Sequence, residues 1–317
     1  MSVIEKINSV GRSTAFSFEL LPPLKGNGIR NVYNTIDELI EFDPKYINIT
    51  THRSQLSYRE MPNGLFERVA ERHRPGTVAI AAAIQNKYKI PVVPHVICGG
   101  FTKEETEYVL IDLQFLGITD LLLLRGDKGK HETSFASTGH NHATELQEQV
   151  NRYNNGFFLD GSKMRVPMEV PFSYGMACYP EKHDEAPNME SDVYWAKKKV
   201  ENGAEYLVTQ MFFDNRKYYD FVRKCRENDI KVPIIPGIKP ITLLNQLTIL
   251  PKIFHSDIPE AFASELRKCK TDADAAEAGV EWCGFQAKDL KANGAPSIHF
   301  YSMMAVKSVK RVAKAVF

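Results

Sequence analysis

Eight short apolar runs recur along this chain of 317 residues, and helical patterns separate them. The runs cover residues 15–20, 46–50, 92–97, 121–124, 173–179, 206–210, 234–236 and 298–301. Most are continuous rather than alternating in polarity, which is typical of parallel strands covered on both faces. Between two of them, Thr106, Leu110 and Leu113 have helical spacing, and Thr102 with Glu105 forms a capping box in front. This alternation predicts an α/β fold, a (β/α)8 TIM barrel that spans 1–317 as a single domain.

A doubly wound parallel sheet is the rival fold. Such a sheet usually carries G-x-G-x-x-G after its first strand, and the nearest approach here, at 26–31, lacks the third glycine. We therefore favour the barrel. Two polar stretches, 128–142 and 154–171, interrupt the βα period, and we expect both to be surface insertions.

The charge balance excludes several classes of partner. The chain has 40 Lys+Arg against 39 Asp+Glu, a net charge of +1, so no overall field attracts it to nucleic acid or to an anionic membrane. Its five cysteines form no C-x-x-C pair, which argues against a zinc cluster or a disulfide framework. The first sixteen residues have no apolar signal core. We expect a cytoplasmic protein that binds neither nucleic acid nor membrane.

Polar residues end most of the apolar runs. They are Glu19, Thr50, His95, Arg125, Gly126, Asp127, Tyr179, Gln210 and Tyr301. Because the carboxyl ends of barrel strands meet at one mouth, these residues are predicted to surround a single small-molecule site.

Glu19 is the leading catalytic candidate. It lies in the sequence FELLPP at 18–23, so its apolar neighbours are expected to raise its pKa toward the range of a general acid. Asp192 and Lys199 are seven residues apart on a predicted helix and share a face, where the lysine could meet a phosphate. The histidines of 131–142 lie in a loop without the rigid spacing of a zinc or iron site, so no metal is expected.

An ordered set of motifs resembles the methylenetetrahydrofolate reductase family. The motifs are FELLPP at 18–23, PH at 94–95, LRGD at 124–127, ACYPEKH at 177–183, TQMFFD at 209–214, IPGI at 235–238 and HFY at 299–301. They occur in order over nearly the whole chain. The resemblance implies a flavoprotein that uses NADH or NADPH to reduce 5,10-methylenetetrahydrofolate to 5-methyltetrahydrofolate, by ping-pong hydride transfer through non-covalently bound FAD. Such an oxidoreductase serves one-carbon metabolism and methionine biosynthesis, and a homo-oligomer is expected.

The same resemblance implies residue roles. Glu19 matches the general acid that protonates N10 of the folate, and Asp127 matches a carboxylate that supports the cationic intermediate. The folate-contacting positions match Glu19, Asp127, Gln210, Gln246 and Tyr301. The flavin-binding positions match Thr50, His95, Arg125, Gly126, Asp127, Ala143, Ala177, Tyr179, His183, Asp192, Lys198 and Lys199. Lys198 stands where the family commonly has arginine, and Trp195 replaces a frequent polar contact.

Two other functions remain open on the sequence alone. One is another flavin-dependent barrel oxidoreductase acting on a different amine, similar to proline dehydrogenase. The other is a barrel that binds ligand without turnover, because Ser302, Met303, Met304 and Ala305 stand where the family often continues Thr-x-Asn-Arg.

Overall fold

Parallel strands form the centre of the molecule. The computed structural model describes residues 2–126, 138–303 and 305–317. The strands are β1 (Ala15–Leu20), β2 (Tyr46–Ile49), β5 (Val92–Ile97), β6 (Asp120–Leu124), β7 (Ser173–Cys178), β8 (Tyr206–Thr209), β9 (Ile234–Ile235), β10 (Gly237–Ile238) and β11 (Ser297–Phe300). Their order in the sheet is β10-β11-β1-β2-β5-β6-β7-β8-β9.

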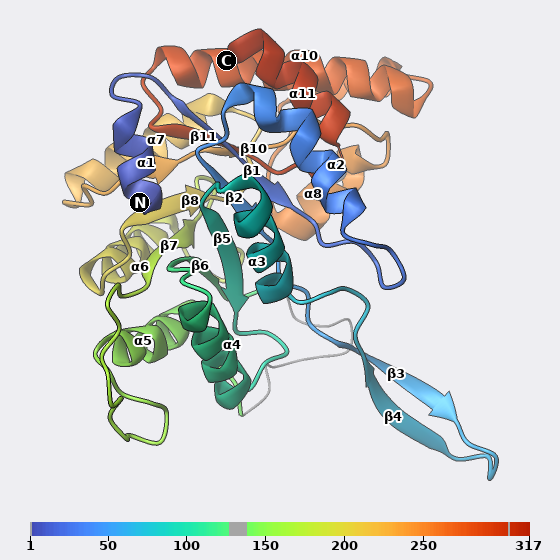
Figure 1. Ribbon diagram of the computed structural model, residues 1–317. Coiled ribbons are helices and arrows are strands. Elements are labelled where there is room, and N and C mark those ends of the chain that lie inside the picture. The colour runs from blue at the N-terminus through green and yellow to red at the C-terminus, as the bar shows by residue number, and fades with distance from the viewer. Residues whose placement is uncertain (1, 127–137, 304) are drawn as a thin grey trace.

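Pro236 divides the seventh strand of the barrel in two. The first half, β9, pairs with β8, while the second half, β10, pairs with β11. Proline has no N–H to donate to a ladder, which explains the interruption at this point. Since β9 and β10 are consecutive in the chain, the two edges of the sheet meet here. The predicted TIM barrel is confirmed (Figure 1).

Helices follow the strands and surround the barrel. They are α2 (Arg30–Leu39), α3 (Thr77–Tyr88), α4 (Lys103–Phe115), α5 (Ala143–Asn154), α6 (Met189–Glu201), α7 (Asn215–Glu227), α10 (Asp272–Ala292) and α11 (Val306–Val316), with η1 (Ile40–Phe42), α8 (Gln246–Phe254) and α9 (Glu260–Lys268) in the loops. The predicted capping box begins α4: Thr102 Oγ1 accepts from Glu105 N at 3.1 Å, and Glu105 Oε2 accepts from Thr102 N at 2.8 Å. None of the helices described is both long and apolar enough to cross a bilayer.

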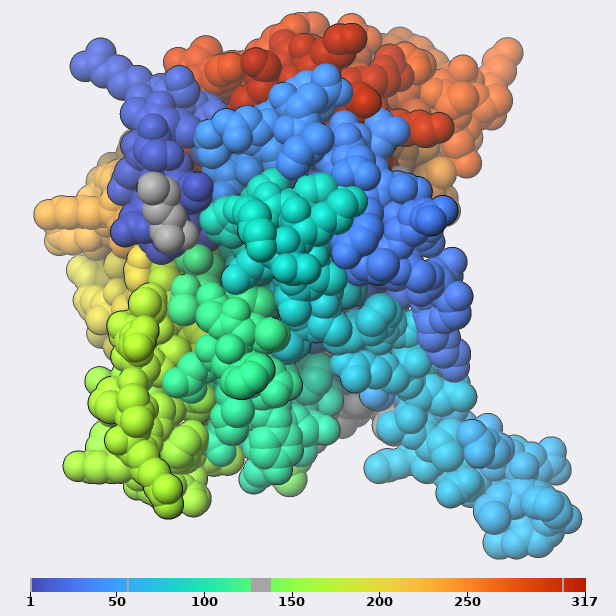
Figure 2. Space-filling model, viewed as in Figure 1, coloured from blue at the N-terminus to red at the C-terminus, as the bar shows by residue number. Residues whose placement is uncertain are grey.

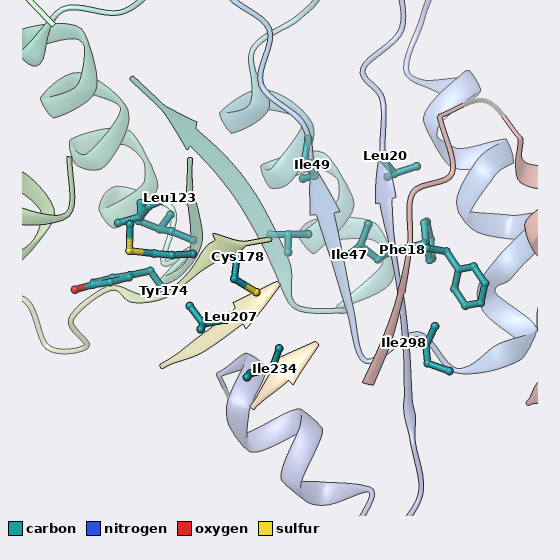
Figure 3. Packing of buried hydrophobic residues seen from close by; sticks show 14 of the residues in the cluster. Phe18, Leu20, Ile47, Ile49, Leu123, Tyr174, Cys178, Leu207, Ile234 and Ile298 are labelled. Atoms are coloured by element: carbon teal, nitrogen blue, oxygen red, sulfur yellow. The ribbon is translucent and has the colours of Figure 1, made fainter. Parts of the chain in front are cut away.

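The core has an outer and an inner part. Outward-facing strand residues such as Phe18, Ile47 and Leu123 pack under the helices, as Figure 3 shows. Inside the barrel, Tyr46 and Tyr206 belong to a second buried cluster. Helix α1 (Val3–Ser9) packs onto this inner cluster and closes the N-terminal end of the barrel. A ligand therefore has to enter at the C-terminal ends of the strands.

A two-stranded antiparallel hairpin projects from the barrel after β2. It comprises β3 (Gln55–Glu60) and β4 (Phe66–Glu71) and extends well beyond the other elements (Figures 1 and 2). No strand was expected in this stretch. Of the two expected insertions, residues 128–137 lie outside the described part of the chain, whereas 154–171 is mostly exposed and packs Phe158 and Met164 against the core.

Candidate active site

Glu19 lies at the end of β1, on the face that points into the barrel. Phe18 and Leu20 beside it belong to the outer core, so the alternation of the strand directs Glu19 inward. Its side chain is buried, with 7% of the residue exposed. Burial raises its pKa to about 7, and the positive charge of Lys239 acts in the opposite direction. The expected upward shift is confirmed. Such a carboxyl can hold and release a proton near neutral pH.

A buried polar layer lies beneath Glu19 inside the barrel. Ser17 Oγ is 3.0 Å from His299 Nδ1, and Asn48 Nδ2 is 3.1 Å from His95 Nε2. Burial lowers the pKa of both histidines to about 3, so both rings are neutral at physiological pH. These residues give the site a floor that has hydrogen-bonding groups but no charge.

Tyr301 crosses the barrel from β11 toward β8. Its hydroxyl donates to the carbonyl oxygen of Thr209 at 2.5 Å. The ring passes directly over Gly237, where an added Cβ would collide with it and would lie 2.7 Å from that same carbonyl oxygen. Gly237 is therefore required for this position of the tyrosine. Gln210 follows β8 and turns its Oε1 to accept from the N–H of Met211 at 2.9 Å.

The end of β7 and the helix α6 bring five of the predicted flavin-binding residues together. Lys199 Nζ donates to the carbonyl oxygen of Ala177 at 2.7 Å, and Asp192 Oδ2 accepts from His183 N at 2.6 Å. The rings of Tyr179 and His183 meet edge to face, with 4.7 Å between their centroids. Burial lowers the pKa of Lys199 and raises that of Asp192. Asp192 and Lys199 therefore share a face of α6 as predicted, and Lys199 is half-buried there.

Three more predicted residues lie at the ends of β2 and β6. Thr50 Oγ1 donates to the carbonyl oxygen of Leu20 at 3.1 Å. Arg125 makes a two-point ion pair with Glu185, in which Nη2 donates to Oε1 at 2.9 Å. Gly126 has a φ of +74°, a conformation that favours glycine. Asp127, the second predicted catalytic residue, lies outside the described residues.

Lys198, Gln246 and Ala143 are not seen to join this group. Lys198 Nζ donates to Glu201 at 2.7 Å on the exposed side of α6. Gln246 begins α8, and its Oε1 accepts from the N–H groups of Thr242 and Leu243 at 2.8 and 3.2 Å, which fixes that turn. Ala143 is the first residue of α5 and packs on the outer core. Their binding roles stay predictions.

The chain matches one known protein family over almost its whole length. The family described as methylenetetrahydrofolate reductase matches residues 4–316. The chain belongs to this family. Relatives include methylenetetrahydrofolate reductase (NADH) 1 of Arabidopsis thaliana, 28% identical over 97% of this chain and 49% of that protein. The probable methylenetetrahydrofolate reductase (NADPH) of Caenorhabditis elegans is 29% identical over 95% of this chain and 42% of that protein.

A bacterial reductase matches over more of its length. The 5,10-methylenetetrahydrofolate reductase of Escherichia coli is 28% identical over 90% of this chain and 85% of that protein. By contrast, the chain spans about half the length of the plant and nematode relatives. Among solved structures, a Clostridium thermocellum protein that binds two copies of 5-methyl-5,6,7,8-tetrahydrofolic acid has a TM-score of 0.55. It is 16% identical, covers 99% of this chain, and supports the fold alone.

One buried charged residue of this reductase family member was not among the predicted site residues. Lys239 follows β10 and is only 2% exposed. The available signal was a lysine inside the otherwise apolar stretch 234–241. A charged residue in such a stretch is unusual, because burying an unpaired charge is strongly unfavourable.

Proposed function

We propose that this chain reduces 5,10-methylenetetrahydrofolate to 5-methyltetrahydrofolate with NADH or NADPH, using FAD held non-covalently at the mouth of the barrel. Family membership over residues 4–316 supports the substrate. The names of its relatives include both coenzymes. The observation that carries the proposal is the burial of Glu19 at the strand ends, with a pKa of about 7.

The residues at the β7 end of the mouth fit a flavin dinucleotide. Lys199 supplies a cation beside the carbonyl of Ala177, which suits a phosphate, and Tyr179 supplies a ring that can stack. Gly126 lets a ligand approach the backbone at the end of β6. Bound FAD would supply the hydride chemistry, with nicotinamide and folate taking turns as donor and acceptor. Lys199, Tyr179, Asp192 and His183 would hold it.

Glu19 then acts as the general acid. Its buried carboxyl keeps a proton near neutral pH and donates it to N10 of the folate, which opens the five-membered ring. The ring-opened folate is cationic, and Asp127 is proposed to stabilise that charge electrostatically. Tyr301 and Gln210, at the ends of β11 and β8, are proposed to position the folate, and Gln246 to contact it.

Product analysis tests this function. The purified protein is incubated with FAD, 5,10-methylenetetrahydrofolate and either NADH or NADPH, and 5-methyltetrahydrofolate is quantified by chromatography. We expect FAD-dependent product with at least one coenzyme. Turnover of proline instead of the folate would favour the proline-dehydrogenase-like alternative. Tight folate binding without any product would favour a barrel that only binds its ligand.

A further inference from the structure

Lys239 is enclosed within the barrel wall directly after β10. Gly237 and Ile235, two and four residues before it, both face the inside of the barrel. Gly237 lies under the ring of Tyr301, and Ile235 belongs to the inner core. Ile238, between Gly237 and Lys239, packs in the outer core. The alternation of the strand therefore places Lys239 on the inner face, like Gly237. Among the described residues, its Nζ has no hydrogen-bond partner.

Glu19 and Lys239 flank the same strand. β11 pairs with β1 on one side and with β10 on the other, and Phe300 is the partner of both Phe18 and Ile238. The next residue is Tyr301 after Phe300, Glu19 after Phe18 and Lys239 after Ile238. Glu19 and Lys239 are thus at the same level of the barrel, in the strands on either side of Tyr301. They attract each other electrostatically without a hydrogen bond or ion pair between them among the contacts described.

The described titratable groups that face this pair, Cys283 and Tyr301, stay neutral. Cys283 of α10 faces Lys239, and burial raises its pKa to about 12. Tyr301 faces Glu19, and burial raises its pKa well above the ordinary value. The Lys239 pKa is lowered by burial to about 8 and raised in part by Glu19. Within the described part of the chain, Glu19 is therefore the group whose ionisation can balance the lysine charge.

We propose that Lys239 is a positioning residue that sets the charge state of the Glu19 carboxyl from across Tyr301, without touching it. This inference rests on the proposed role of Glu19 as the acid. Burial alone would make Glu19 hold its proton too tightly, and the ammonium group of Lys239 opposes that effect. The separation also leaves the carboxyl free to face the substrate.

The proton balance follows directly. Glu19 gives its proton to the substrate nitrogen and becomes a carboxylate, and the ammonium group of Lys239 stabilises this carboxylate. The carboxylate later regains a proton from water after product leaves. Lys239 keeps its own protons throughout, so it acts through charge alone.

Infrared titration of the Glu19 carboxyl tests the proposal without folate. The C=O band of the protonated acid is assigned by its loss in Glu19→Gln and is followed with pH in wild type, Lys239→Met and Lys239→Arg. We expect Lys239→Met to raise the midpoint by about 1 pH unit or more, because an opposite charge nearby shifts a carboxyl by about 1–3 units. Lys239→Arg, which keeps the charge, should stay within about 0.5 unit. An unchanged midpoint in folded Lys239→Met overturns the proposal.

A reciprocal measurement covers the case in which Lys239→Met does not fold. Coupling between two sites acts equally in both directions. The Lys239 pKa is followed by NMR of labelled lysine. Its fall in Glu19→Gln should equal the rise of the Glu19 pKa in Lys239→Met. An unchanged Lys239 pKa would overturn the proposal. Because neither titration needs folate, a wild type that forms no 5-methyltetrahydrofolate refutes the proposed function but not the charge coupling.

Discussion

Replacing Glu19 with glutamine removes the acid while keeping its shape. In the folded chain the pKa of Glu19 rises from 4.5 to about 7. A carboxyl with a raised folded-state pKa contributes stability that is fully present below pH 4.5 and lost as the pH rises through 7. At about 1.4 kcal/mol per pKa unit, a shift of this size corresponds to about 3 kcal/mol of unfolding free energy. Glutamine cannot ionise and does not incur this loss.

Urea unfolding at several pH values measures the effect. At pH 9 the Lys239 amine, with a folded pKa of about 8, is mostly neutral and does not complicate the comparison. There we expect Glu19→Gln to be more stable than wild type by up to about 3 kcal/mol, with the difference vanishing below about pH 5. Glu281→Gln, on the exposed side of α10, is the matched control and should follow wild type. Parallel pH profiles for wild type and Glu19→Gln would refute the reasoning.

The same variant has a catalytic consequence. A general acid typically contributes about 10²–10⁴-fold in rate, so Glu19→Gln should slow reduction of the folate by that factor. The half-reaction in which nicotinamide reduces the flavin should be nearly unaffected, because it needs no proton from Glu19. Stopped-flow absorbance separates the two half-reactions. Unimpaired folate reduction would remove Glu19 from the mechanism.

Three further perturbations test other parts of the structure. Lys199→Met removes the half-buried amine beside Ala177 and should weaken FAD binding about 10-fold or more in a fluorescence titration. Lys198→Met alters an exposed side chain and should change the Kd for FAD by less than about threefold. Equal effects of the two variants would contradict the assignment. Gly237→Ala should lower stability by about 1–3 kcal/mol in thermal unfolding, because the added Cβ has no space. Gly284→Ala in α10 is the control: its added Cβ would meet nothing within 4 Å, and it should raise stability by about 0.5–1 kcal/mol. His299 has a folded pKa of about 3, so it contributes stability that is present above about pH 6.5 and lost progressively below it. In acid urea melts, wild type should lose about 1.4 kcal/mol of unfolding free energy per pH unit relative to His299→Gln. Identical dependence of the unfolding free energy on pH in the two proteins would refute a buried neutral ring.

The barrel was predictable because its signal is local and repeated. Seven of the apolar runs correspond to single strands. The run at 234–236 corresponds to β9 and ends at Pro236, whereas β10, at Gly237–Ile238, lies beyond the predicted run. Glu19 was also accessible from sequence, since its apolar neighbours and its place at the end of β1 determine its burial. The local sequence pattern is therefore sufficient to predict a residue's burial when its own strand and immediate neighbours determine that burial.

Other features depend on chain segments that the sequence does not bring together. Nothing local shows that Lys239 is buried opposite Glu19, because that follows from β10 and β11 joining beside β1. The hairpin of β3 and β4 did have a local signal: Asn63-Gly64 lies at its turn, and Gly64 adopts a φ of +76°. Asn-Gly between short alternating segments is a strong hairpin pattern, and its strands were missed because they are polar and exposed.

An anaerobic visible spectrum of the FAD-loaded protein tests the central claim most directly. The spectrum is recorded alone, after NADH or NADPH, and again after 5,10-methylenetetrahydrofolate once excess nicotinamide is removed. The proposed function predicts that the flavin absorbance disappears with nicotinamide and returns with the folate. A protein that binds no FAD, or a reduced flavin that the folate does not reoxidise, would contradict it.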